Sequence, residues 1–183
     1  EFFDRVAHVP ARRLAFCGIE KNAITLVQKL AHRLNFGDAP FQYLSSAPLL
    51  TNLTFPAFLA ALRRGALRFA VVYRDPYDRF ASAFRSKCRR ADGDGAAHCD
   101  AVFGLAGPEL TPENVALRIE RGRENAHWAP QTSFCGGTVL SHAARYVAIP
   151  FEDAAAGLAR FLAPDVAAGA LRRRDLDRLL RPA

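Results

Sequence analysis

One pattern occurs twice in this sequence and restricts its fold: a short apolar run stops at charged residues and is followed at once by an amphipathic helical pattern. The first run, Leu14 to Ile19, precedes apolar positions at helical spacing over residues 22–34. The second run, Phe69 to Tyr73, precedes helical spacing over residues 78–87. Alternating strands and helices predict an α/β, P-loop-like three-layer fold with a central parallel β-sheet flanked by helices.

The remaining chain fits one α/β unit. A length of 183 residues with half of them hydrophobic can bury one core, so we expect a single domain over residues 1–183. Residues 89–111 are rich in glycine and have no clear period, which predicts a loop insertion. We expect further helices over residues 54–63, 112–123, 151–162 and 167–180, and short strands at residues 41–44 and 145–149.

Both charged turns fall where parallel sheets bind ligands, at the carboxyl ends of strands. The turn at Glu20 and Lys21 opens a helix with Asn22 as its expected N-cap, and the free amides of a helix start bind phosphate. The second turn places Arg74 at a strand end and Ser82 on the following helix, where both can reach one phosphate. A complete phosphate loop of the nucleotide triphosphatases is absent, which argues against a nucleotide kinase.

Charge and cysteine content narrow the partners and the compartment. Lysine and arginine outnumber the acids 25 to 18, so the surface attracts anions; the C-terminal arginines 172–174, 178 and 181 are interpreted as a solvated helix face. The four cysteines form no CxxC pair, which argues against a zinc site and favours disulfides. The sequon Asn52-Leu53-Thr54 also indicates a secretory compartment. No apolar run is long enough to span a bilayer, and the first residues lack a signal-peptide pattern.

The second turn carries a family resemblance. Residues 69–87, Phe-Ala-Val-Val-Tyr-Arg-Asp-Pro-Tyr-Asp-Arg-Phe-Ala-Ser-Ala-Phe-Arg-Ser-Lys, resemble the 3′-phosphate-binding strand and helix of the Golgi carbohydrate sulfotransferases, which include the chondroitin, dermatan, HNK-1 and heparan 2-O enzymes. These enzymes use 3′-phosphoadenosine 5′-phosphosulfate (PAPS). The resemblance implies that Arg74 and Ser82 hold the 3′-phosphate of this cofactor.

The first turn is similar to the 5′-phosphosulfate loop of the same family. The resemblance assigns cofactor binding to Lys21, Asn22, Ala23, Ile24 and Thr25, and it implies that Lys21 also neutralises the leaving 5′-phosphate during catalysis. Two positions depart from the family pattern: Glu20 stands in place of the usual proline, and Ile24 in place of a small or hydroxylated residue.

A third segment, residues 125–136, is similar to the His-Trp/Phe-x-Pro-Gln-x-x-x-Cys segment of the family. His127 is a candidate catalytic base, and Glu20 is a second candidate. An alternative interpretation of this segment is structural, with a hydrogen-bonded histidine and a packed tryptophan. Residues 146–152 resemble a strand and helix start near the end of the family domain, and we assign them a structural role.

The resemblance implies a transferase that moves the sulfuryl group of PAPS to a hydroxyl of a carbohydrate acceptor, without a metal, and releases 3′,5′-bisphosphoadenosine. The alternative is a catalytically inactive relative that binds polyanions; no nucleic-acid-binding pattern is present. The family also implies the Golgi lumen, with a type II membrane anchor outside this chain. Cys99 with Cys135 is the preferred disulfide of the three possible pairings, holding the insertion at the acceptor side, and Cys17 is expected as a buried thiol.

Overall fold

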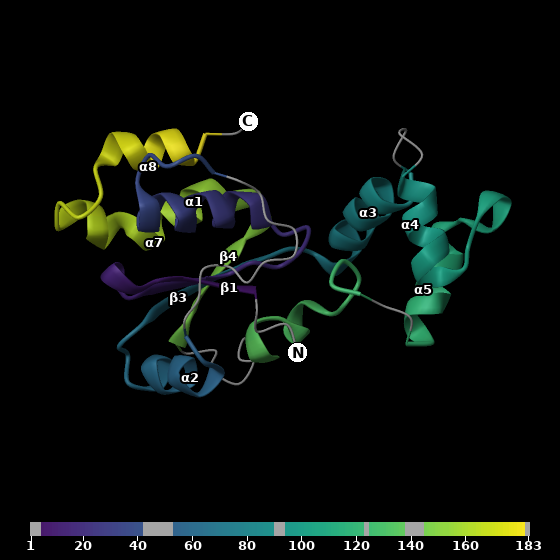
Figure 1. The fold of residues 1–183 in the computed structure, drawn as a ribbon, viewed down its shortest axis with the longest axis horizontal. Coiled ribbons are helices and arrows are strands. Elements are labelled where there is room, and N and C mark those ends of the chain that lie inside the picture. The colour runs from purple at the N-terminus through teal and green to yellow at the C-terminus, as the bar shows by residue number, and fades with distance from the viewer. Residues whose placement is uncertain (1–4, 42–52, 90–93, 123–124, 138–144, 182–183) are drawn as a thin grey trace. The chain divides into compact units, whose positions relative to one another are not determined.

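The computed structural model describes residues 5–41, 53–89, 94–122, 125–137 and 145–181, which form two compact units (Figure 1). Unit 1 contains Glu1–Tyr73 and Gln131–Ala183, and unit 2 contains Arg74–Pro130. Unit 2 is therefore inserted in the sequence of unit 1, between its third strand and the segment that begins at Gln131. Each unit has its own buried core.

Unit 1 is built on a four-stranded sheet. Its strands are β1 (Val6–Val9), β2 (Leu14–Cys17), β3 (Arg68–Tyr73) and β4 (Val147–Pro150), in the order β1-β2-β3-β4. Strands β2, β3 and β4 are parallel, and β1 pairs antiparallel with β2. The predicted α/β fold with a mostly parallel sheet packed against helices is thus confirmed. Strand β1 was not predicted, because a four-residue antiparallel edge strand leaves little periodic signal.

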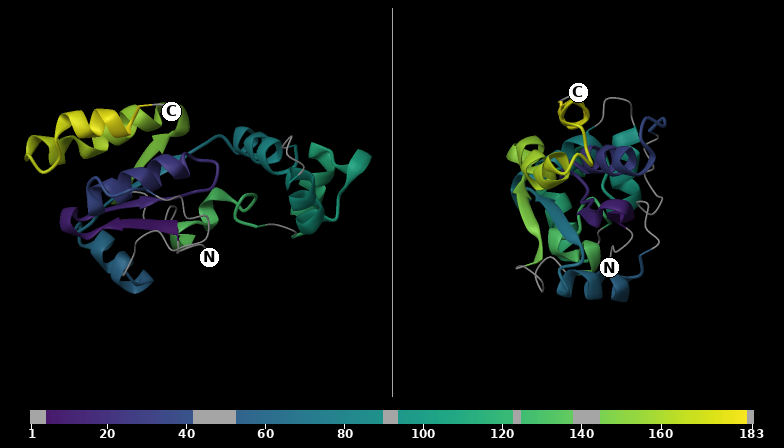
Figure 2. Two further views of the ribbon diagram at one scale, coloured as in Figure 1. Left: turned by 45° about the horizontal axis from the view of Figure 1, so that its top comes forward. Right: turned by 90° about the vertical axis from the view of Figure 1, so that its left-hand side faces the viewer.

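Helices cover both faces of this sheet (Figures 1 and 2). One face carries α1 (Ile24–Phe36), α7 (Ala154–Ala167) and α8 (Arg173–Leu179), and their buried residues share a core with Leu14 and Phe16 of β2. The opposite face carries α2 (Phe55–Arg63), where the ring of Phe58 meets that of Phe69 at 5.1 Å. Side chains alternate between the two faces of the sheet along β2 and β3. Consecutive buried residues therefore pack against helices on opposite faces.

Unit 2 consists of helices α3 (Pro76–Lys87), α4 (Asp94–Phe103) and α5 (Pro112–Glu120). Their common core includes Phe84, Cys99, Phe103 and Trp128. The range 89–111, expected as a loop insertion, therefore contains a helix. Cys99 and Phe103 lie one helical turn apart and are both fully buried, and this short apolar face holds α4 against α3.

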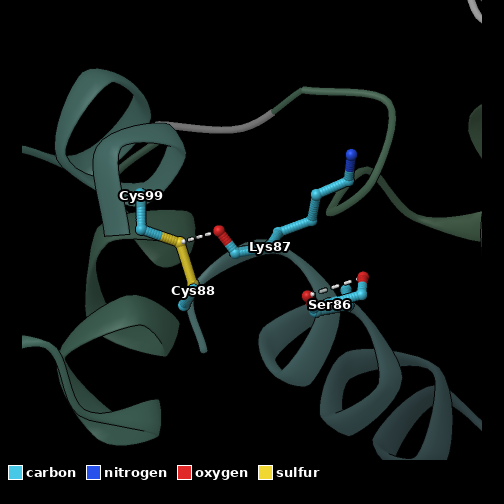
Figure 3. Close-up of a disulfide and its surroundings, with 5 residues drawn as sticks. Ser86, Lys87, Cys88 and Cys99 are labelled. Carbon is cyan, nitrogen blue, oxygen red and sulfur yellow. Dashed lines mark hydrogen bonds between the residues drawn. A yellow bond between two sulfur atoms is a disulfide. The ribbon is translucent and has the colours of Figure 1, made fainter. Parts of the chain in front are cut away.

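The two disulfides correct the predicted pairing. Cys88, directly after α3, is bonded to Cys99 of α4 (Figure 3), and Cys17 at the end of β2 is bonded to Cys135. The expected Cys99–Cys135 bond and the free Cys17 thiol were both wrong. Packing of α3 against α4 brings the Cα atoms of Cys88 and Cys99 to 5.4 Å, while Cys17 lies on the face of β2 opposite Phe16 and meets Cys135 there, at a Cα separation of 6.0 Å.

The other elements follow the predictions within a few residues, with three exceptions. The helix expected over residues 167–180 is shorter than predicted, because α7 continues to Ala167, Gly169 is left-handed, and α8 begins only at Arg173. Asn22 is not the N-cap of α1, because Ala23 occupies that position in the left-handed region. The strand expected at residues 41–44 falls mainly outside the described residues. Short 3₁₀ helices complete the fold: η2 (Pro10–Arg12), η3 (Gly107–Glu109), η4 (Gln131–Ser133), η5 (Cys135–Gly137) and η7 (Phe151–Asp153). No helix in the part of the chain that the structure describes is long and apolar enough to cross a membrane.

Candidate cofactor site

The loop between β2 and α1, residues 18–23, has the backbone of an anion-binding loop. Lys21 and Ala23 both adopt the left-handed conformation, with φ of 66° and 59°. The amide of Val27 donates to the carbonyl of Ala23 at 3.1 Å, so the amides of residues 24–26 precede the first hydrogen bond of the helix. When left-handed residues lie next to the first turn of a helix, neighbouring backbone amides can point into one concavity. Such a concavity suits a phosphate or sulfate group.

An ion pair holds the first half of this loop to β1. Glu20 is buried, and its carboxylate lies 3.3 Å from the guanidinium of Arg5. The carbonyl of Arg5 also accepts a hydrogen bond of 2.9 Å from the amide of Gly18. The carboxylate that replaces the usual proline of the family loop is therefore matched by the cation of Arg5, which directly precedes β1.

The second half of the loop is held through Asn22, which is fully buried. Its Nδ2 donates to the carbonyl of Val72 in β3 at 3.1 Å and also to Oε1 of Gln131. A buried amide with these two partners ties the loop to the neighbouring strand and to the segment that follows unit 2. Asn22 is thus placed to fix the shape of the loop rather than to cap the helix.

The Cys17–Cys135 disulfide adds a covalent link at the same place. Cys17 is the residue immediately before the loop, and Cys135 lies four residues after Gln131. Both ends of the segment 131–135 are therefore linked to the region of the loop. Gln131 accepts a hydrogen bond from Asn22 through its side-chain oxygen, and Cys135 is bonded to Cys17. Two cross-links of different kinds restrict the backbone in which Lys21 and Ala23 adopt left-handed conformations.

Side chains of the loop differ in what they can offer a ligand. Lys21 is half-buried and Thr25 is exposed, whereas the Ile24 side chain is buried and contributes only its amide. A cavity of about 440 Å³ opens beside Ala23 and Thr25 and is also lined by Phe151. Its lining is mainly apolar, as expected of a site that encloses the body of an organic ligand.

Arg74 and Ser82 lie in unit 2, Arg74 just before α3 and Ser82 near the middle of that helix. Arg74 directly precedes Asp75, the N-cap of α3, whose side chain accepts hydrogen bonds from the amides of Tyr77 and Asp78 at 2.9 and 3.1 Å. Ser82 lies on α3 itself and is half-buried. The cap at Asp75 fixes the backbone between Arg74 and Ser82. The positions of these two residues relative to each other are therefore defined within unit 2.

A buried arginine, Arg79, organises the segment that carries His127. Its guanidinium donates to the carbonyls of Ala129 and Ala126 at 2.7 and 3.2 Å. These two carbonyls flank His127, whose ring centroid lies 5.8 Å from that of His98. The ring of Trp128 packs against those of Phe80 and Phe103, so the tryptophan of the motif has a structural role. This packing also positions the neighbouring residue, His127.

The predicted residues are thus divided between the units. The five loop residues, 21–25, belong to unit 1, and Arg74, Ser82 and His127 belong to unit 2. Sequence reasoning missed Arg5 and Gln131, which hold the loop. Gln131 could have been found, because it belongs to the quoted motif, but nothing in the sequence connects Arg5 to Glu20. Among the described residues, no group of three or more His, Cys, Asp or Glu side chains could hold a metal ion.

Comparison with known protein families gives one match. The model of the sulfotransferase family matches residues 5–156, which include β1, the cofactor loop, the α3 segment and the start of α7. No curated protein and no solved structure matched the chain. The matched range contains both predicted phosphate-binding turns in their order along the chain. The chain therefore belongs to the sulfotransferase family, and within it to the Golgi carbohydrate sulfotransferases, which are PAPS-dependent transferases.

Proposed function

We propose that this chain transfers the sulfuryl group of PAPS to a hydroxyl of a carbohydrate acceptor and releases 3′,5′-bisphosphoadenosine. The observation that carries the proposal is the loop of residues 18–23, in which Lys21 and Ala23 are left-handed at the start of α1. This backbone suits an anionic group, and the chain belongs to a family that uses an anionic donor.

In this proposal the loop binds the 5′-phosphosulfate. The amides of residues 23–25 and the positive end of α1 donate to its oxygens, while the amide of Asn22 donates to the carbonyl of Ile19 at 3.1 Å. Thr25 adds a hydroxyl, and Lys21 neutralises the charge that develops on the 5′-phosphate. The cavity beside Ala23 and Thr25 is large enough to enclose the nucleoside part of the ligand. PAPS supplies the sulfuryl group, which moves to the acceptor oxygen as that oxygen loses its proton.

The resemblance assigns the 3′-phosphate to Arg74 and Ser82. The hydrogen bonds of Asp75 to the start of α3 support this assignment, because they fix the helix on which Ser82 lies. Arginine also offers the planar fork that binds a phosphate through two hydrogen bonds. This contact would distinguish PAPS from adenine nucleotides that have no 3′-phosphate.

We propose His127 as the base that takes the acceptor's proton. An imidazole side chain can accept a proton near neutrality, and Arg79 holds the carbonyls of Ala126 and Ala129 close to His127 in the chain. Glu20 is the weaker candidate, since its buried carboxylate is paired with Arg5 and a base must reach its substrate. We therefore assign Glu20 a structural role.

Two disulfides indicate a domain of the secretory pathway. We propose the Golgi lumen as its location, through a membrane anchor outside this chain, as in the family. Asn52, the acceptor of the sequon, lies outside the described residues, so glycosylation stays a prediction from the sequence.

The decisive experiment is calorimetric titration with 3′,5′-bisphosphoadenosine in the absence of metal. We expect the native chain to bind it, adenosine 5′-phosphate to bind much more weakly, and Arg74→Ala to lose at least about tenfold in affinity, because a charge-assisted contact is removed. Arg85→Ala is the matched control, since it removes an exposed arginine from α3, the helix that follows Arg74. A folded native chain that binds neither nucleotide would contradict the proposal.

Transfer itself is tested by incubating the chain with ³⁵S-labelled PAPS and a panel of carbohydrate acceptors. Turnover would exclude the alternative of an inactive relative that only binds polyanions. That alternative is favoured if bisphosphoadenosine binds but no acceptor is labelled. His127→Ala should then be compared with the native chain, and we expect kcat to fall about 100-fold or more while nucleotide affinity is unchanged.

A further inference from the structure

Unit 1 contains a second cavity, of about 280 Å³, between α1 and α8. Its wall from α1 carries Lys29, His32 and Arg33, and its other wall carries Arg178 and Arg181, with Asp175 as the acidic residue. None of its basic side chains belongs to the cofactor loop or to the arginine and serine assigned to the 3′-phosphate. Of the C-terminal arginines interpreted as a solvated helix face, Arg178 and Arg181 therefore line a cationic cavity.

Asp175 is the one acidic residue among the described lining residues of this cavity, and its charge is already compensated. Asp175 accepts a hydrogen bond of 2.7 Å from Nε of Arg172, which is the main reason why its pKa lies below the ordinary value; the charges of Arg172, Arg174 and Arg33 act in the same direction. Arg33 is paired with Asp38 as well. Among the described residues, none forms an ion pair with Lys29, Arg178 or Arg181, so the cavity keeps a net positive charge.

This cavity adjoins the one beside the cofactor loop. The two cavities share the lining residues Lys29, Leu179 and Arg181. The larger cavity, of about 440 Å³, is also lined by Ala23 and Thr25. A continuous path of lining residues therefore runs along α1 from the cofactor loop to the basic cavity, all within unit 1.

We propose that the basic cavity binds a sulfate or carboxylate group carried by an acidic carbohydrate chain. The inference rests on the proposed function, since a transferase that makes sulfate esters on a carbohydrate meets chains that already carry such groups. The volume is near the lower end for a small-ligand site and suits one charged sugar rather than a longer segment. Arginine side chains on one wall and lysine on the other provide the fork and the point charge that oxyanions accept.

The test compares Arg178→Glu with Arg173→Glu. Both substitutions reverse one exposed charge on α8, but only Arg178 lines the cavity. The probes are a chondroitin sulfate hexasaccharide, the same hexasaccharide after chemical desulfation, and inorganic sulfate, each titrated calorimetrically. We expect Arg178→Glu to weaken hexasaccharide binding about tenfold and Arg173→Glu about twofold or less, because Arg178 can contact a ligand in the cavity directly, whereas Arg173 acts on that ligand only through longer-range, screened attraction.

The titrations distinguish a specific carbohydrate site from attraction by overall charge and from a site for free anions. Equal loss in both variants would show attraction by overall charge and overturn the proposal, as would a native chain that does not bind the hexasaccharide. Binding of inorganic sulfate that depends on Arg178, with hexasaccharide binding unaffected, would leave a free-anion site and overturn the carbohydrate assignment. Arg178→Ala serves as the variant if Arg178→Glu does not fold. Titration with 3′,5′-bisphosphoadenosine distinguishes failure of the cofactor site, since we expect Arg178→Glu to bind that nucleotide as the native chain does.

Discussion

The guanidinium of Arg5 lies 3.3 Å from the carboxylate of Glu20, and both side chains are almost entirely buried, with 11% and 6% of their surface exposed. This pair joins the residue just before β1 to the loop of residues 18–23, and it explains how a buried carboxylate is tolerated in a loop that we propose binds an anionic ligand. The negative charge of Glu20, which departs from the family pattern, is therefore balanced by the positive charge of Arg5.

Arg5→Ala should lower the free energy of unfolding by about 3 kcal/mol, because it leaves a buried carboxylate without this cation. Glu20→Gln should cost less, and Arg5→Ala combined with Glu20→Gln should cost less than the sum of the two. Urea denaturation of the four proteins measures this coupling. Strictly additive losses would show that the pair does not act as a unit.

The two disulfides should differ in their contribution to stability. Cys17 and Cys135 are 118 residues apart and Cys88 and Cys99 are 11 apart, so chain entropy assigns about 5 and about 3 kcal/mol to them, respectively. We expect Cys17→Ser/Cys135→Ser to lower the melting temperature more than Cys88→Ser/Cys99→Ser. The first double variant should also bind 3′,5′-bisphosphoadenosine more weakly, whereas equal affinities would show that the disulfide has no part in shaping the loop.

Gly157 in α7 should not tolerate alanine, although alanine normally favours a helix. A Cβ atom at this position would lie 2.3 Å from Cγ2 of Ile149 in β4, so the helix would have to move away from the sheet. We expect Gly157→Ala to lower the free energy of unfolding by about 1–3 kcal/mol. Ile149→Ala should partly rescue it by removing the clashing group, and the absence of any rescue would place the strain elsewhere.

His8 in β1 should make the chain less stable in mild acid. Burial lowers the pKa of His8 from its ordinary 6.5, so the folded chain binds fewer protons at this position than the unfolded chain as the pH falls through 6.5. The free energy of unfolding therefore decreases below this pH. His8→Gln should flatten the decrease, as measured by urea denaturation between pH 5 and 7.5. His32→Gln, at a half-buried position of α1, is the control.

The strands and helices around the two turns could be predicted because their signals are local. The apolar run before Glu20 and the run before Arg74 each stop abruptly, and the helical spacing that follows is strong. Helix α4 was missed because Gly95 in its first turn weakens its propensity, while burial of Cys99 and Phe103 stabilises it in the folded chain.

What the sequence did not reveal depends on contacts between distant residues. Asn22 looked like a helix cap from its neighbours, but its partners are Val72 and Gln131, which are 50 and 109 residues away. The same is true of Cys17 and Cys135, where three pairings were equally compatible with the spacing. Local pattern predicted a phosphate-binding turn at residues 18–23, but not the distant residues that hold this loop in place.

The Cys17–Cys135 bond has a consequence for limited proteolysis. Unit 2 is an insertion, so one peptide cleavage between α4 and α5 would divide the polypeptide into two fragments, each carrying part of the four-stranded sheet. The disulfide joins β2 in the first fragment to Cys135 in the second. A nicked molecule would therefore migrate as one species without reductant and as two with it, and the sheet could keep its strands together after the backbone had been cut.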